Sequence, residues 1–264
     1  MTGIIDKMET RFGDPVEYFL PIGTEKLGMN QFIGKSLTIQ WTNKIQCLHC
    51  GKTTKKSFGQ GYCYPCFISI PETEDCVLNP QLCRAHEGIA RDMVWAAEHC
   101  LQDHFVYLAL SSDVKVGVTR KSQIPTRWMD QGAWKAIKLA KTPNRYLAGL
   151  IEMELKKVMP DKTNWRNMLK NVIDPSRDLI YEKQHAAASL SDSLSPYVLE
   201  ENEIVEVHYP VLTYPIKPES VDLEKKTSIS GILTGIKGQY LLFDSGQCLN
   251  VRKHGGFVVE VTDK

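Results

Sequence analysis

Two CxxC pairs hold the residues best suited to bind a metal ion. Cys47-Leu-His-Cys50 is followed, after twelve intervening residues, by Cys63-Tyr-Pro-Cys66. Each pair forms a tight turn that aims two thiolates at one point, and the loop between them lets the two turns face each other. Gly51 suits the bend of the chain around the sulfurs. The spacing predicts a structural Zn²⁺ ion with no open position for water; an iron–sulfur cluster or four free thiols are the alternatives.

A second, less regularly spaced group of cysteines and histidines follows. Cys100 and His104 share one helix face if the helix suggested by 92–102 continues to His104. We expect a second zinc site here, with His86 as a substitute for the histidine, and the alternative is a set of buried free thiols beside surface histidines. The four predicted ligands are Cys76, Cys83, Cys100 and His104. Such a site would join this region directly to the strand that begins at residue 105.

The central stretch of the chain begins with two short runs of apolar residues, 105–110 and 114–118, separated by Ser-Ser-Asp. Both runs are rich in β-branched or aromatic residues and the separator forms turns, so the pattern predicts a hairpin. Gly117 lies inside the second strand, where a glycine indicates a bulge or the close approach of a ligand or another element. Helices are then expected around 133–140 and over 145–158.

Elements after Pro160 divide into helices and then strands. Helices are expected over 166–173, with Thr163 or Asn164 as its cap, and over 178–188. From residue 203 onward, short strands with glycine breaks predict a small β-barrel, which the strand expected over 32–41 completes. The predicted fold class is α+β. The expected segments are an N-terminal β segment, a zinc-binding region, an α/β core and a C-terminal β module, over 1–45, 46–104, 105–190 and 191–264.

Composition and charge narrow the class of protein. The chain has 264 residues, 42% hydrophobic and 24% charged, and no apolar run approaches the roughly 18 residues of a membrane span. The N-terminus does not resemble a signal peptide, so a cytoplasmic location is expected, where cysteines bind metals rather than form disulfides. The formal net charge of +1 hides thirteen Lys/Arg against four Asp/Glu over 115–170, and eleven acidic against five basic residues over 174–226. The basic stretch suits a phosphate-bearing partner, although a solvated helix face is an equal alternative.

The order of hairpin and helices resembles the GIY-YIG nuclease superfamily. Tyr107, in Val-Tyr-Leu, matches the first motif, and Lys115-Val-Gly117 matches the second, with Lys115 where the family has a tyrosine. Arg127 and Glu152 match the family's arginine and glutamate. The resemblance implies a site in which Tyr107 orients or deprotonates water, Arg127 stabilises charge on the phosphoryl group, and Glu152 holds Mg²⁺.

Two points within that site stay open. The motif order favours Glu152, whereas a helical wheel over this segment places Glu154 on the apolar face, which makes Glu154 the second choice. Lys115 is either a base with a pKa depressed by burial or a phosphate contact in a site that binds without cutting. Further phosphate contacts are expected from lysines and arginines in the first cysteine loop and after the hairpin: Lys55, Lys56, Arg120, Lys121 and Lys135.

The chain is more closely similar to an uncharacterised bacterial domain-of-unknown-function family. Its members join a four-cysteine ribbon to a VYL…KVG…RW…DQGA block, which spans roughly residues 30–170 here. Together, these features predict a zinc-scaffolded protein that binds DNA or RNA and no membrane, with metal-dependent phosphodiester cleavage as the activity that the nuclease resemblance implies. The alternatives are a non-catalytic nucleic-acid-binding or adaptor protein and a nucleic-acid-modifying enzyme that is not a nuclease.

Overall fold

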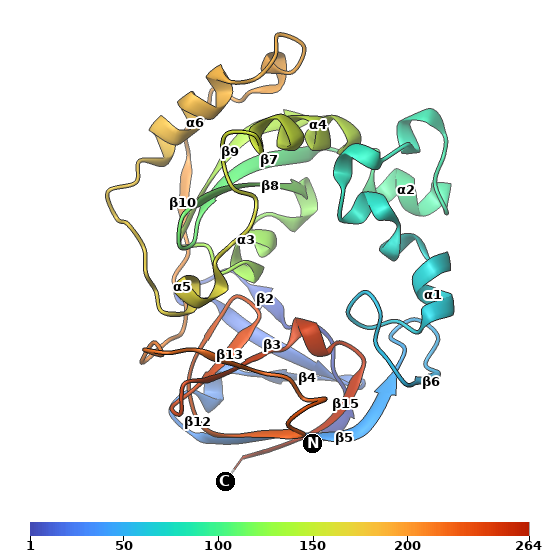
Figure 1. Cartoon of the computed structure of the whole chain (residues 1–264), viewed down its shortest axis with the longest axis vertical. Helices are drawn as coiled ribbons and strands as arrows, with labels where there is room; N and C mark the ends of the chain where they lie inside the picture. The colour runs from blue at the N-terminus through green and yellow to red at the C-terminus, as the bar shows by residue number, and fades with distance from the viewer. Residues whose placement is uncertain (264) are drawn as a thin grey trace. The chain divides into compact units, whose positions relative to one another are not determined.

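The computed structural model describes residues 1–263, and these form two compact units (Figure 1). The first unit combines the two ends of the chain and, of the described residues, contains 1–68, 169–171 and 207–263. The second unit contains residues 69–168 and 172–206. None of the helices formed by residues 1–263 is long and apolar enough to cross a membrane.

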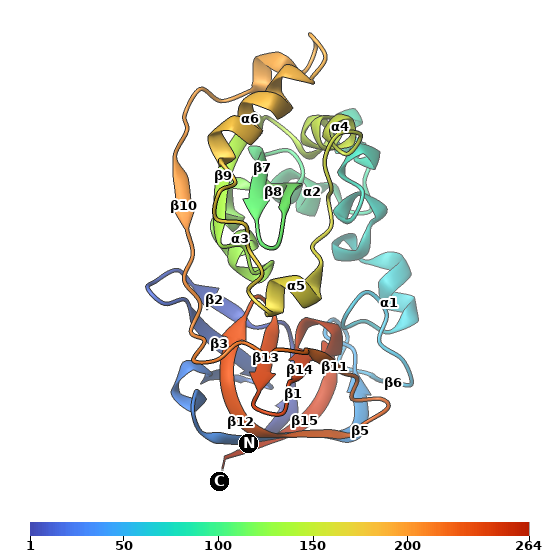
Figure 2. The same ribbon diagram turned by 60° about the vertical axis from the view of Figure 1, so that its left-hand side comes forward.

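The first unit is built around a curled sheet whose strands come from both ends of the chain (Figure 2). β5 (Ser36–Gln46) pairs antiparallel with β12 (Ser228–Lys237) on one side and with β15 (Phe257–Asp263) on the other. The prediction that the strand near 32–41 completes the C-terminal β module is therefore confirmed. The remaining strands of this sheet are β1 (Thr2–Ile4), β6 (Thr53–Thr54), β11 (Glu219–Val221), β13 (Tyr240–Phe243) and β14 (Gln247–Asn250).

A smaller sheet and one short helix complete the first unit. The sheet consists of β2 (Glu9–Arg11), β3 (Glu17–Ile22) and β4 (Glu25–Gly28). β3 alternates half-buried and buried side chains along its length, as expected for a strand with one face on the core. Helix α1 (Tyr64–Ser69) begins directly after Cys63, inside the second CxxC pair, and carries Cys66.

The second unit contains a four-stranded sheet in the order β10-β9-β7-β8. The predicted hairpin is confirmed as β7 (His104–Leu110) and β8 (Val114–Arg120), which pair antiparallel over seven residues. β9 (Lys135–Thr142) pairs with the other edge of β7, and β10 (Ile204–Glu206) pairs with β9. The helices of this unit are α2 (Met93–His99), α3 (Thr126–Asp130), α4 (Arg145–Leu155), α5 (Trp165–Leu169) and α6 (Leu179–Ala188).

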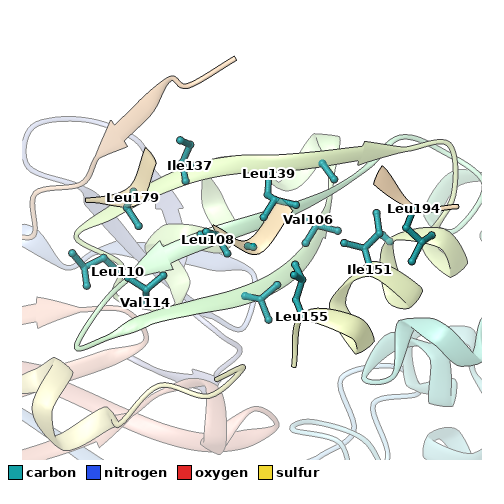
Figure 3. Close-up of a cluster of buried hydrophobic side chains, with 14 residues drawn as sticks. Val106, Leu108, Leu110, Val114, Ile137, Leu139, Ile151, Leu155, Leu179 and Leu194 are labelled. Carbon is teal, nitrogen blue, oxygen red and sulfur yellow. The ribbon is translucent and has the colours of Figure 1, made fainter. Parts of the chain in front are cut away.

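One face of this sheet forms the main core of the second unit (Figure 3). Val106, Leu108 and Leu110 alternate along β7 and point to this face, which α4 covers with Ile151 and Leu155. The 3.6-residue period of α4 and the two-residue period of β7 thus meet in one apolar layer. The alternate residues of β7 face the other way, where Tyr107 and Ala109 join a second buried cluster with Trp128, Ala133 and Ala136.

Local signals in the sequence placed most of these helices correctly. Asp92 and Asp178 cap α2 and α6 by accepting hydrogen bonds from backbone N–H groups in the first turn. Asn164 rather than Thr163 caps α5, because its Oδ1 accepts from the N–H of Asn167 at 3.2 Å.

The prediction of a helix around residues 133–140 is wrong. This segment is β9, a central strand between β7 and β10, and the nearest helix is the short α3 before it. Alanine, leucine and lysine favour a helix locally, but hydrogen bonding to two neighbouring strands outweighs that preference. β10 belongs to the same sheet, although its sequence lies in the expected C-terminal β module; the four-segment division of the chain remains a prediction.

Candidate functional site: two cysteine clusters and a polar sheet face

The four cysteines of the CxxC pairs converge on one point. Their sulfur atoms all lie within 4.8 Å of one another, which is the arrangement that can hold a metal ion. Gly51 adopts φ +70° after the first pair, as its predicted role in the turn requires. The convergence follows from two local turns joined by a loop whose strand β6 pairs with the end of β5.

Backbone hydrogen bonds to Cys47 stabilise negative charge in this cluster. Burial raises the pKa of the Cys47 thiol, but hydrogen bonds from the backbone of Cys50, Cys63 and His49 outweigh burial and lower the pKa to about 6. The thiolate is the form of cysteine that binds a metal ion. The first cluster therefore offers the chemistry that its spacing predicts.

A second cluster brings together Cys76, Cys83 and Cys100. Their sulfur atoms also lie within 4.8 Å of one another, and all three side chains are buried. Hydrogen bonds from the Cys100 and Cys76 thiols hold the pKa of the Cys83 thiol far below its ordinary value. Three of the four ligands predicted for the second metal site are thus adjacent.

The two candidate histidines differ in their surroundings. Neither is part of the group of three sulfurs, but His104 is buried and Cys83 is near enough to raise its pKa, although burial lowers that pKa to about 4 overall. The His104 Nδ1 atom lies 2.7 Å from the carbonyl oxygen of Gln102. His86 is instead stacked on Tyr146, with its side chain 30% exposed.

The second face of the β7–β8 hairpin carries the residues that resemble a nuclease motif. Tyr107 lies directly opposite Gly117 in the strand pairing, and Lys115 lies opposite Ala109. A Cβ atom at position 117 would lie 2.5 Å from the Tyr107 hydroxyl oxygen. The glycine in the second strand is therefore explained by the close approach of another element, the ring of Tyr107.

Tyr107 is surrounded by residues of α3 and the turn after it. Its hydroxyl donates a hydrogen bond of 3.0 Å to Oε1 of Gln131, and its ring packs edge-on against Trp128 at 6.0 Å between centroids. Burial raises the pKa of Tyr107, and the neighbouring Arg127 guanidinium opposes that rise. Gln131 belongs to the Asp-Gln-Gly-Ala segment, but its part in the site was not foreseen. Because the tyrosine is fully buried and protonated, it suits a positioning role.

Glu152 rather than Glu154 lies near this group. Glu152 is only 8% exposed, and its charge affects the pKa of Tyr107, while Arg127 in turn affects the pKa of Glu152. Burial raises the pKa of the Glu152 carboxyl group. The Glu154 carboxylate instead accepts hydrogen bonds of 3.0 Å from the backbone N–H and the hydroxyl of Ser191. Glu152 rather than Glu154 is thus the glutamate whose charge acts on Tyr107 and is acted on by Arg127, while Glu154 binds Ser191.

Lys115 and Asp161 complete the charged group. Lys115 is 6% exposed, and burial together with Arg127 lowers its pKa to about 8. Asp161 affects the pKa values of both Lys115 and Glu152. The Lys156 ammonium group lies 3.2 Å from Glu152 Oε2 and 3.3 Å from Asp161 Oδ2, so two carboxylates converge on one cationic position. Asp161 was missed, since its only signal is its place directly after the proline that ends the predicted helix.

The expected phosphate contacts differ in how free their charges are. Lys55, Lys56 and Lys121 are exposed, and Arg120 is half-buried. Lys135 donates to the Glu206 carboxylate at 2.7 Å, because β10 brings the acidic stretch alongside β9. Lys138 is likewise within 3.5 Å of carboxylates from that stretch. The charge asymmetry along the sequence is thus partly cancelled within the second unit.

Comparison with known proteins identifies the family of the chain but indicates no particular activity. No curated protein and no solved structure matches the chain. A family model described as "Protein of unknown function (DUF2797)" matches residues 34–259, which include both cysteine clusters and the sheet of the second unit. The chain therefore belongs to the DUF2797 family.

Proposed function

We propose that this protein binds nucleic acid on a zinc-stabilised scaffold and hydrolyses phosphodiester bonds at the site formed by Lys115, Arg127 and Glu152. The observation that supports this function is the mutual electrostatic effect of residues from separate elements, β7, β8, α3 and α4, on one another's pKa values. Shifted pKa values in a group of unlike charges are typical of catalytic sites. The likeness of the motifs to GIY-YIG nucleases supports the same proposal.

Each side chain has a role that fits its surroundings. Arg127 stabilises the charge that develops on the phosphoryl oxygens. Tyr107, fixed by Gln131, holds Arg127 in place and does not itself act as a base, because burial keeps it protonated. Lys115, with its pKa near 8, takes the proton from the attacking water once it is neutral.

The carboxylates of Glu152 and Asp161 fit a hard divalent cation. Both already face one cationic group, the ammonium of Lys156, and carboxylate oxygens are the ligands that Mg²⁺ prefers. A divalent ion bound there would neutralise charge on the scissile phosphate. Lys156 would have to move aside, and its long side chain, one-third exposed, permits this.

Cleavage assays on single- and double-stranded DNA and RNA with Mg²⁺ or Mn²⁺ test the proposal. Glu152→Gln should abolish cleavage and keep binding, because an amide does not hold the ion as a carboxylate does. Arg127→Ala should slow cleavage on the order of a hundredfold or more. The wild-type rate should increase with pH up to about 8 and then level off, as Lys115 loses its proton.

Matched controls come from the same elements. Glu154→Gln changes a carboxylate on the same helix and should leave cleavage unchanged. Arg166→Ala removes an exposed basic residue from the same basic stretch and should leave the cleavage rate within about twofold. Wild-type protein that cuts none of the four substrates would refute the hydrolytic role.

A binding protein without catalysis is the second candidate. The observation that favours it is the ion pair between Glu152 and Lys156, together with Lys115 at the position of the family's tyrosine. In that function the lysines and Arg127 contact phosphates only. Affinity should then decrease steeply with salt, with no cleavage under any metal condition.

A further inference from the structure

Arg145, the first residue of α4, is a buried cation with an unusual set of partners. It is 9% exposed. Its guanidinium group donates to the carbonyl oxygens of Cys76 and His99 at 3.2 and 3.1 Å, and lies 3.7 Å from the Cys76 sulfur. Its backbone N–H donates to the Cys100 carbonyl at 2.8 Å. Among residues 1–263, no carboxylate forms an ion pair with it. Within these residues the Cys76 sulfur is the only side-chain atom in hydrogen-bonding contact with it, and the Trp95 ring lies 5.8 Å from its Cζ atom.

This placement is costly unless negative charge lies nearby. A guanidinium group stays protonated in proteins, and burying a charge without a counter-charge costs several kcal/mol. The N-terminal end of a helix is also the end that disfavours a cation. Neutral thiols would not offset these costs. Three adjacent thiolates would do so, but they repel one another unless a metal ion joins them.

We propose that Arg145 supplies the counter-charge of a metal centre formed by Cys76, Cys83 and Cys100, with His104 as the fourth ligand. The two positive charges of Zn²⁺ and the three negative charges of the thiolates leave one negative charge, and a neutral histidine adds none. The single charge of Arg145 matches it. This inference is independent of the proposed hydrolysis.

The hydrogen bonding of His104 suits the role of fourth ligand. A carbonyl oxygen only accepts hydrogen bonds, so the 2.7 Å contact with Gln102 places the proton on Nδ1 and leaves the Nε2 lone pair free. Metal-binding histidines are commonly oriented in this way. Because Nε2 is not yet within 4.8 Å of all three sulfurs, the ring shifts toward them when the ion binds.

The centre would fix two elements of the second unit. His104 begins β7 and Arg145 begins α4, so one ion holds the strand of Tyr107 and the helix of Glu152 together at their first residues. The loop between Cys76 and Cys83 also packs on α4, since a Cβ at Gly149 would lie 2.2 Å from the backbone nitrogen of Gln81.

Zinc content by mass spectrometry, combined with competition against a chelator, tests the proposal in the full chain. Wild-type protein should hold two ions, and Cys83→Ser should hold one. Arg145→Met and His104→Gln should each lower the affinity for the second ion by about 10–100-fold, whereas Arg145→Lys should retain part of that affinity. The controls are Arg84→Met, an exposed arginine that directly follows Cys83, and His86→Gln; both should keep two ions.

X-ray absorption on the wild-type protein makes the test independent of mutant folding. The two sites together should show seven sulfur ligands at about 2.3 Å and one nitrogen ligand at about 2.0–2.1 Å. A shell of sulfur alone would overturn the role of His104. One ion in the wild type, or full affinity in Arg145→Met, would overturn the counter-charge.

Discussion

Gly117→Ala tests how tightly the hairpin is built around Tyr107. The added methyl group would lie 2.5 Å from the Tyr107 hydroxyl oxygen and 2.7 Å from Cζ, so the ring must move by about 0.9 Å to reach an ordinary contact of 3.4 Å. The ring has no free space, because Tyr107 is fully buried and packs against Trp128. The substitution therefore strains the hydrogen bond to Gln131.

The expected cost follows from three terms. Overpacking a core costs about 1–3 kcal/mol, and the strained hydrogen bond costs about 1 kcal/mol. Alanine recovers about 0.5–1 kcal/mol because it loses less backbone entropy on folding than glycine does. We expect Gly117→Ala to lower the free energy of unfolding by about 1–3 kcal/mol. Gly28→Ala is the control, since its methyl group would meet nothing closer than 3.8 Å and should change stability by less than about 0.5 kcal/mol.

Urea unfolding followed by tryptophan fluorescence measures this cost. Four of the five tryptophans, all except Trp41, lie in the second unit, so fluorescence reports mainly on the unit that contains Gly117, and far-UV circular dichroism of the same samples also reports on the unit that contains Gly28. In a Tyr107→Phe background the cost of Gly117→Ala should decrease by about 1 kcal/mol, because the hydroxyl and its hydrogen bond are already absent. Strictly additive costs, or a stabilised Gly117→Ala variant, would refute the contact.

The remaining predictions concern packing, pH and metal. Gly149→Ala should destabilise the protein by about 1–3 kcal/mol in urea, although alanine is the better helix former, because its methyl group would meet the backbone of Gln81 at 2.2 Å. Burial lowers the pKa of Lys115 from 10.5 to about 8. Between pH 8 and 10.5 the unfolded chain therefore binds more protons than the folded chain, and the free energy of unfolding of the wild type should increase with pH in that range. Lys115→Met should reduce that increase and stabilise the protein at pH 7 by on the order of 3 kcal/mol, yet weaken nucleic-acid binding; an unstable variant at pH 7 would contradict the buried charge. Chelation of the metal, or Cys63→Ser, should expose the loop after β5 to proteolysis, and unchanged cleavage patterns would show that this cluster is not structural.

Functional and structural demands conflict at two positions. Lys115 and Arg145 are buried cations that an apolar residue of similar size would replace without the cost of desolvation. Natural sequences retain such residues where the site needs the charge. In our two proposals these charges serve separate sites, Lys115 the hydrolytic site and Arg145 the second cysteine cluster.

The sequence alone determined the features whose physical causes lie within a few residues. The four sulfurs of the CxxC pairs converge on a point that could hold a metal ion because spacing and Gly51 control where the sulfurs point. The hairpin follows from two apolar runs and a turn between them, and α2 and α6 begin where aspartates accept the first backbone N–H groups.

Only the tertiary structure decided the features that depend on distant partners. Residues 135–142 form β9 because β7 and β10 supply hydrogen bonds on both sides, and local propensity contains no record of these neighbours. Glu152 rather than Glu154 is buried and acted on by the charge of Arg127 because the approach of α4 to the sheet sets which side of the helix is buried. Asp161 and Arg145 gain their importance from contacts across the fold. Such contacts arise from packing between elements, which a pattern along the chain does not specify.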